Sequence, residues 1–258
     1  MKAGINLFTL KKFISCEEDM IETSIALRDM GYSYLQFSGA PFDEGAIRKM
    51  VDASDLPVVL THVPYDRIIG DTDGLMEAHD SFGCRRIGLG AMPRQLLLDE
   101  VSAKSAVDGL ERVAEKMKSH GFEFFYHHHH FEFRRMGGET LFDYMVRCAP
   151  SIKFTVDTYW LQYGGVDVIS TIERLRGRMD CIHLKDYGIL PVTDSEGNVS
   201  FAPTFMPVGD GNMDFGSIVK AAEKSGARYY LVEQDNASAS ADPFGEVERS
   251  IRYIREEL

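Results

Sequence analysis

The stretch FEFFYHHHH, residues 122–130, decides the fold, because it joins an aromatic, strand-forming run to a polar end. Seven other short apolar runs of this kind occur along the chain, and each is bounded by turn-forming or charged residues. The strands are therefore expected at 2–8, 33–38, 57–63, 85–90, 122–130, 152–158, 179–185 and 229–235.

Helical patterns separate these runs. Apolar residues recur at helical spacing between 15 and 31, within 101–119 and within 243–258, where Pro243 opens the last helix. Eight strands, each followed by a helix, in 258 residues predict an α/β fold, namely one closed (β/α)8 TIM barrel domain over 1–258. An open doubly wound sheet is the alternative, but the first strand lacks the phosphate-binding glycines typical of it.

Composition limits the partners. The formal net charge is −12, with 40 acidic against 28 basic residues, and such a balance repels phosphate backbones and anionic membranes. We expect no nucleic-acid or membrane partner, a small-molecule substrate and, since no signal-like or long apolar run is found, a cytoplasmic location. The four cysteines form no CxxC pair and are expected to be reduced thiols. A homo-oligomer is compatible with these features.

Residues 188–211 are expected to form a long loop after the seventh strand, which would act as a lid over bound substrate. Within it, Gly209-Asp210-Gly211 is either a plain turn or a backbone phosphate site, and the negative Asp210 favours the plain turn.

Polar residues end most of the strands, where a barrel carries its active site. Strand alternation turns His127 and His129 inward, with Tyr126 and His128 toward the helices. The third strand ends in His62. By the same parity, inward-facing side chains end the sixth, seventh and eighth strands, namely Asp157, His183, Lys185, Glu233 and Asp235. Several carboxylates and imidazoles at one mouth need a cation, and mixed nitrogen and oxygen donors favour Mn²⁺, Zn²⁺, Co²⁺ or Fe²⁺ over Ca²⁺.

These strand ends resemble the sugar phosphate isomerase/epimerase group of the xylose isomerase-like TIM barrel superfamily. The likeness is densest over 121–258. It is carried by Tyr126–Phe133 (YHHHHFEF), Val156–Trp160 (VDTYW), Ile182–Tyr187 (IHLKDY), Pro207–Gly211 (PVGDG) and Leu231–Asp235 (LVEQD).

The resemblance implies one divalent metal, with Mn²⁺ or Zn²⁺ favoured and Co²⁺, Fe²⁺ or Mg²⁺ as alternatives. Asp157, His183 and Glu233 match three of the family's ligands. The strand-five ligand is left between Glu132, which balances the charge better, and His127, which stands where many relatives carry a glutamate.

The resemblance also implies chemistry beside a sugar carbonyl through an enediolate. Glu132 and Glu233 are the candidates for moving the carbon-bound proton, and His129 for a proton to or from oxygen. Lys185 would neutralise an oxyanion, or form a salt bridge to Asp157 or Glu233. The substrate-binding candidates are His62, His127 and Trp160, and core packing is the alternative for Trp160.

Four functions are compatible with this pattern. The leading one is a metal-dependent sugar isomerase or epimerase, and the second is a dehydratase or lyase of a keto-sugar or keto-glycoside, which starts from the same enolate. An endonuclease IV-like enzyme needs a phosphate-binding surface, which the net charge of −12 disfavours. A non-catalytic sugar binder is the fourth.

Overall fold

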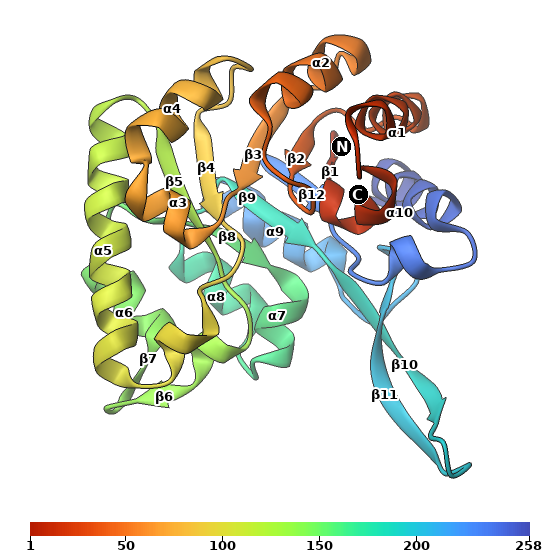
Figure 1. Cartoon of the computed structure of the whole chain (residues 1–258). Helices are drawn as coiled ribbons and strands as arrows, with labels where there is room; N and C mark the ends of the chain where they lie inside the picture. The colour runs from red at the N-terminus through yellow and green to blue at the C-terminus, as the bar shows by residue number, and fades with distance from the viewer.

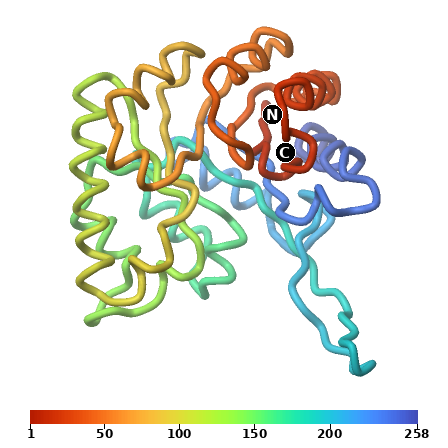
Figure 2. Tube along the Cα trace, in the orientation of Figure 1, coloured from red at the N-terminus to blue at the C-terminus, as the bar shows by residue number.

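A computed structural model describes all residues, 1–258, and its centre is a closed barrel of eight parallel strands. Going round the barrel, the strand order is β1-β12-β9-β8-β5-β4-β3-β2, so each barrel strand pairs with its neighbours in the chain's own succession. Helices surround the barrel (Figure 1), and the tube in Figure 2 shows both termini on the same side of it. The predicted α/β class and TIM barrel are confirmed.

The barrel strands lie inside the predicted runs but are shorter. They are β1 (Gly4–Asn6), β2 (Leu35–Phe37), β3 (Val58–His62), β4 (Arg86–Leu89), β5 (Glu123–His127), β8 (Lys153–Asp157), β9 (Cys181–Leu184) and β12 (Tyr229–Val232). The fifth run was drawn too long: the strand ends at His127, and Phe131–Phe133 form a short 3-10 turn.

The helices follow the predicted pattern, and α1, α5 and α10 fill the three ranges expected from apolar spacing. The α-helices are α1 (Glu17–Met30), α2 (Glu44–Ser54), α3 (Tyr65–Gly70), α4 (Thr72–Asp80), α5 (Glu100–Ser119), α6 (Leu141–Cys148), α7 (Thr158–Tyr163), α8 (Val168–Arg174), α9 (Phe215–Ser225) and α10 (Pro243–Glu257). Short 3-10 turns cover η1 (Leu7–Phe13), η2 (Arg94–Leu97), η3 (Phe131–Phe133) and η4 (Ala237–Ala239). No helix is long and apolar enough to span a bilayer.

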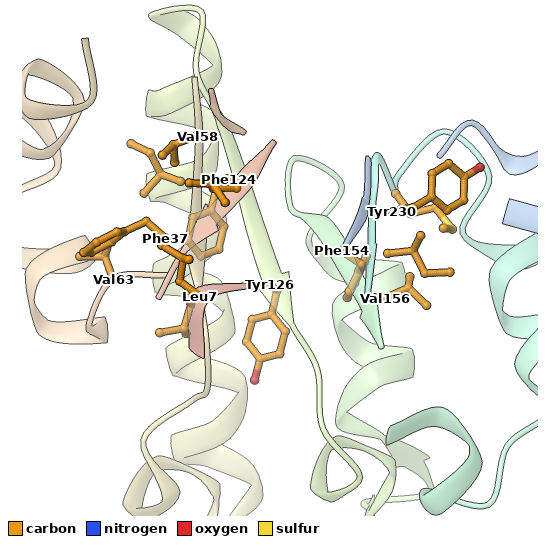
Figure 3. Close-up of a cluster of buried hydrophobic side chains, with 14 of the residues drawn as sticks. Leu7, Phe37, Val58, Val63, Phe124, Tyr126, Phe154, Val156 and Tyr230 are labelled. Atoms are coloured by element: carbon orange, nitrogen blue, oxygen red, sulfur yellow. The ribbon is translucent and has the colours of Figure 1, made fainter. Parts of the chain in front are cut away.

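Two layers of packing hold these elements together. The main core lies between the strands and the helices and includes Phe124, Tyr126, Phe154 and Val156, as Figure 3 shows. A smaller cluster of alternating strand residues contains Phe125, Cys181 and Leu231. The parity predicted for these strands is therefore confirmed, and it is this parity that directs the intervening polar side chains to one mouth.

The prediction of a long loop at 188–211 is wrong. Residues 186–206 form an antiparallel hairpin, β10 (Asp186–Thr193) and β11 (Val199–Met206), with eight residue pairs in register. It projects away from the barrel (Figure 1), and we call it the arm. β-branched and aromatic residues alternate on both sides of a short turn, which favours strands over a loop. A second, much shorter hairpin pairs β6 (Arg135–Met136) with β7 (Glu139–Thr140).

Candidate metal centre

Four buried side chains from adjacent strands converge at the carboxyl ends of β5, β8, β9 and β12. They are His127, Asp157, His183 and Glu233, and one donor atom from each lies within 4.8 Å of the other three. All four are at most 5% exposed. We call this group the metal centre. Three of its members are the family-matched ligands predicted from the sequence, and the fourth is His127.

The imidazole of His127 is oriented by the neighbouring strand. Its Nδ1 lies 2.8 Å from the carbonyl oxygen of Gly90, which can only accept a hydrogen bond. Nδ1 therefore donates to this carbonyl, and Nε2 faces the metal-side carboxylates, Asp157 Oδ2 at 3.4 Å and Glu233 Oε2 at 4.0 Å. A histidine whose second nitrogen donates to a carbonyl is the usual arrangement around a metal.

His183 is held in the same way by a side chain of β2. Its Nε2 lies 2.7 Å from Oε1 of Gln36, while the Gln36 amide nitrogen approaches both ring nitrogens of His62, at 3.0 and 3.2 Å. The Nδ1 of His183 then points at Glu233 Oε2, and neither atom has a hydrogen-bond partner. Gln36 thus holds Nε2 of His183, and Nδ1 forms an ion pair with the Glu233 carboxylate.

The two carboxylates are each anchored by one oxygen and leave the other free. Asp157 Oδ1 accepts from the backbone N–H of Trp160 at 3.0 Å, which caps α7, while Oδ2 faces the centre. Glu233 Oε1 accepts from the Asn6 amide at 3.1 Å. Two carboxylate oxygens and two imidazole nitrogens therefore meet in a buried space, where positive charge must balance the carboxylates.

Burial and the close approach of charged neighbours shift the pKa values of these groups. Burial raises the pKa of Asp157, but Lys185, His127 and His183 outweigh it and hold that pKa well below the ordinary value. Burial lowers the pKa of His183, but the charges of Glu233 and Asp157 bring it to about 9. Two ionised carboxylates and two oriented imidazoles form a donor set that fits a divalent transition metal.

Lys185 lies beside the metal centre and is almost fully buried. Its Nζ is 2.9 Å from Asp235 Oδ1, 3.4 Å from Asp157 Oδ2 and 3.6 Å from Glu233 Oε2. Burial alone lowers its pKa, yet these carboxylates raise the pKa above the ordinary lysine value, so the amine stays charged. The salt bridge weighed from the sequence is present, and it extends to Asp235 as well.

A cavity of about 230 Å³ opens next to the centre. It is lined by Phe8, Ser38, His62, Gly90, Ala91, His127, His129, Lys185, Glu233 and Asp235. His62 and His129, both predicted to meet substrate, therefore line one space with two members of the metal centre. Trp160 lies just outside that lining, with the Lys185 amine 5.0 Å from its ring centre and His129 packed against it.

Glu132, predicted from the sequence as a ligand and as a base, is not brought into this group. Its carboxylate accepts from the Tyr126 hydroxyl at 2.6 Å and from the backbone N–H of His129 at 2.8 Å. Tyr126 faces the helices, so a side chain bound to it lies behind the strand rather than in the mouth. Burial raises the pKa of Glu132 to about 7.

Two other sequence features are now placed. The His128 ring lies on the helix side and accepts from the Asp157 backbone N–H at 3.1 Å. The Gly209-Asp210-Gly211 segment is a turn whose glycine N–H groups donate to Asp186 Oδ2, at 2.9 and 3.0 Å. Since those donors are taken, the plain-turn alternative describes it.

The sequence reasoning did not select Asn6 and Gln36, and it noted Asp235 only as an inward residue. The available signal was a single polar residue inside an otherwise apolar strand. Such a residue in GIN or LQF must find a buried partner, and both partners belong to the metal centre.

Known proteins resemble this chain along most of its length. A family model described as the xylose isomerase-like TIM barrel matches residues 25–257. An inosose dehydratase of Geobacillus thermodenitrificans is 29% identical over 163 residues, which is 58% of this chain and 53% of that protein. The chain thus spans about half the length of the curated relatives it matches.

Solved structures share the fold at lower identity. A sugar phosphate isomerase/epimerase from Parabacteroides distasonis superposes with a TM-score of 0.80 at 22% identity, covering 99% of this chain and 94% of the other. A structure of L-ribulose 3-epimerase gives a TM-score of 0.70 at 19% identity, with the same two coverages. These likenesses confirm the barrel type expected from the strand-end motifs.

Proposed function

Because the chain belongs to the xylose isomerase-like TIM barrel family, we propose that it is a divalent-metal-dependent isomerase or epimerase. Its substrate would be a sugar or sugar derivative, and the reaction would occur beside a carbonyl through an enediolate. One observation carries the proposal: four donor atoms lie within 4.8 Å of one another, and two of their residues, His127 and Glu233, line a cavity together with the buried Lys185.

The proposed ligands are His127, Asp157, His183 and Glu233, so His127 takes the strand-five place instead of Glu132. Mn²⁺ or Zn²⁺ suits two imidazoles and two carboxylates best, with Co²⁺, Fe²⁺ and Mg²⁺ as alternatives. When bound, the ion would polarise the carbonyl and the adjacent hydroxyl of the substrate. In this arrangement Gln36 and the Gly90 carbonyl keep both imidazoles in the metal-binding tautomer.

The proposed substrate contacts come from the cavity wall. His62 lines the cavity, and the Gln36 amide nitrogen approaches its two ring nitrogens at 3.2 and 3.0 Å, so Gln36 would position this ring against a substrate hydroxyl. Burial lowers the pKa of His62 well below its ordinary value, and the neighbouring His127 and His183 lower it further, so the ring is neutral. Trp160 would provide a flat apolar surface for a sugar ring.

Proton transfer is assigned to residues on two sides of the cavity. Glu233 and Asp235 extend from β12, and burial raises the pKa of Asp235, as suits a carboxylate that takes a proton from carbon. The charged Lys185 would stabilise the developing enediolate. Burial lowers the pKa of His129 to about 2, so this neutral imidazole would accept a hydrogen bond from a substrate hydroxyl without taking its proton. Glu132 is then a positioning residue, since it holds the His129 backbone.

A second candidate is a dehydratase, and the likeness to inosose dehydratase favours it. The same removal of a proton beside a carbonyl would be followed by loss of a β-hydroxyl. The carboxyl group formed when Asp235 takes the proton from carbon would return that proton to the leaving hydroxyl, which departs as water. Lys185, kept charged by three carboxylates, would stabilise the negative charge that develops there.

Deuterium exchange separates these candidates. The protein is incubated in D₂O with Mn²⁺ and a panel of ketoses and inososes, and the products are followed by NMR and mass spectrometry. An isomerase or epimerase incorporates deuterium at carbon without loss of water, whereas a dehydratase gives a product lighter by one water. Protein treated with EDTA is the control. If every substrate stays protonated at carbon and intact, the chain is a binder and the proposal is rejected.

A further inference from the structure

The arm has one face that is free of charge from base to tip. Ladder partners on this face are Tyr187 with Phe205, Ile189 with Pro203, Pro191 with Phe201 and Thr193 with Val199. The base of the face belongs to the barrel mouth, because Phe205 packs on Tyr159 and Trp160. Its outer part packs on nothing: Phe201 is 71% exposed and Val199 is 64% exposed.

An exposed apolar face of this kind is typical of a surface that binds a partner. A two-stranded hairpin without a packed face is only marginally stable in water, and contiguous exposed apolar surface marks an interaction site. The arm nevertheless keeps eight register pairs, the first of them at the barrel, and the hairpin extends outward from there (Figure 2).

A surface of matching chemistry lies on the other side of the barrel mouth. A hollow of about 190 Å³ is lined by Arg94, Leu97, Leu98, His130, Phe131, Arg134 and Met136, and we call it the rim groove. One of its lining residues, Leu98, is 73% exposed, and Val101, three residues further along the chain, is 79% exposed. It is apolar enough to receive Phe201 and Val199.

Charge also matches between the two surfaces. The tip of the arm carries Asp194 and Glu196, whose carboxylates form no ion pair within the chain. The rim groove carries Arg94 and Arg134, which likewise form none; Arg94 lies over the Phe131 ring, 5.5 Å from its centre. Opposite unpaired charges therefore flank both apolar surfaces.

We propose that the rim groove binds the arm of a second copy of this chain, so that two copies form a reciprocal dimer with facing barrel mouths. Figure 1 shows the arm and the β6–β7 rim on opposite sides of the same barrel end. A two-fold axis between two such ends brings each arm to the partner's rim, and both contacts form at once, as a closed symmetric dimer requires.

The dimer has a consequence for the cavity. The rim groove includes His130 and Phe131, and these rings pack on Trp160 and His129 at the mouth. The arm of one copy therefore adds an outer wall to the active-site mouth of the other. This inference does not depend on the proposed reaction, because it rests on the surfaces alone.

Sedimentation velocity over a range of concentrations tests the dimer. We expect a species of twice the chain mass for the wild type. Phe201→Asp on the arm and Leu98→Asp in the groove should each raise the dimer dissociation constant by more than about tenfold, since each buries a charge in an apolar contact. Both side chains are exposed in one copy, so these variants fold, which circular dichroism verifies.

Two further variants make the test specific. Val192→Asp lies on the opposite face of the arm and should leave the dimer intact. Glu196→Arg or Arg94→Glu alone should weaken it several-fold, and the two together should restore it. A monomeric wild type overturns the proposal. So does a Leu98→Asp protein that dimerises as well as the wild type while Phe201→Asp does not, because the arm would then have another partner surface.

Discussion

The metal centre and the arm use their residues in opposite ways. The four residues of the centre are polar, at most 5% exposed, and each has one atom held by a second partner. The outer arm is apolar and exposed and rests on no other element. In the first region burial is costly for each polar group unless hydrogen bonds or opposite charges compensate it, and in the second region exposure is costly for each apolar group. We have therefore proposed a different partner for each region, a divalent metal for the first and a second copy of the chain for the second.

The largest effect is expected at the centre. Glu233→Gln removes one negative charge from the lone pairs that face the metal, and we expect activity to fall by at least about a thousandfold with weaker metal binding. Metal content by mass spectrometry and turnover in the deuterium assay measure this. Val192→Ser on the arm is the matched control and should keep wild-type turnover. Wild-type activity in Glu233→Gln would remove the centre from the mechanism.

A pH-dependent effect on stability is expected at Glu132, which lies outside the metal centre. The pKa of Glu132 is raised by burial to about 7, so the folded chain binds a proton there more tightly than the unfolded chain does. Its stabilising contribution is complete below the unfolded pKa and is lost as pH rises through about 7. Glu132→Gln imitates the protonated form and escapes this loss.

We therefore expect Glu132→Gln to gain stability relative to the wild type between pH 5 and pH 8, by up to about 3 kcal/mol. Urea unfolding at both pH values measures the difference. Glu196→Gln at the exposed tip of the arm is the control and should show no such change. A Glu132→Gln difference that is the same at both pH values would mean that Glu132 is ionised throughout.

A smaller effect is expected at Gln36, which contacts the proposed metal ligand His183. Gln36→Leu removes the acceptor that fixes the His183 tautomer, and the metal dissociation constant should rise by about 10–100-fold. Gln162→Leu, at an exposed position of α7, is the matched control. Mn²⁺ titration followed by calorimetry measures both. An unchanged affinity in Gln36→Leu would show that His183 needs no such partner.

The sequence predicted the centre better than the arm for a physical reason. Strand parity is local and has a period of two, so Asp157, His183 and Glu233 could be directed inward from their apolar neighbours alone. The ligand of the fifth strand was harder to predict, because it depends on where β5 ends. The strand ends at His127, and the turn that follows lets the Glu132 carboxylate accept a hydrogen bond from Tyr126, six residues earlier. Asn6 and Gln36 meet partners more than 140 residues away, and no local pattern carries that information.

The arm was misread because a long, Gly/Pro-punctuated stretch without a buried face looks like a loop. Side chains alternate between the two faces of the hairpin, but both faces are rich in apolar residues. The sequence pattern therefore does not indicate which face would be buried. What such a hairpin packs against lies outside its own chain in the dimer proposed above.

The smallest effect is expected where the arm faces neither the barrel nor the proposed partner. Val192 is 44% exposed, so Val192→Ser should change the free energy of unfolding by less than about 0.5 kcal/mol. Val156, in β8, is fully buried, and Val156→Ser should cost more than about 2 kcal/mol through a lost packing volume and a buried hydroxyl. The substitution is identical in both strands, so denaturant unfolding measures only the difference in surroundings. Equal losses would mean that the arm is packed within one chain, and the contrast between the two regions would disappear.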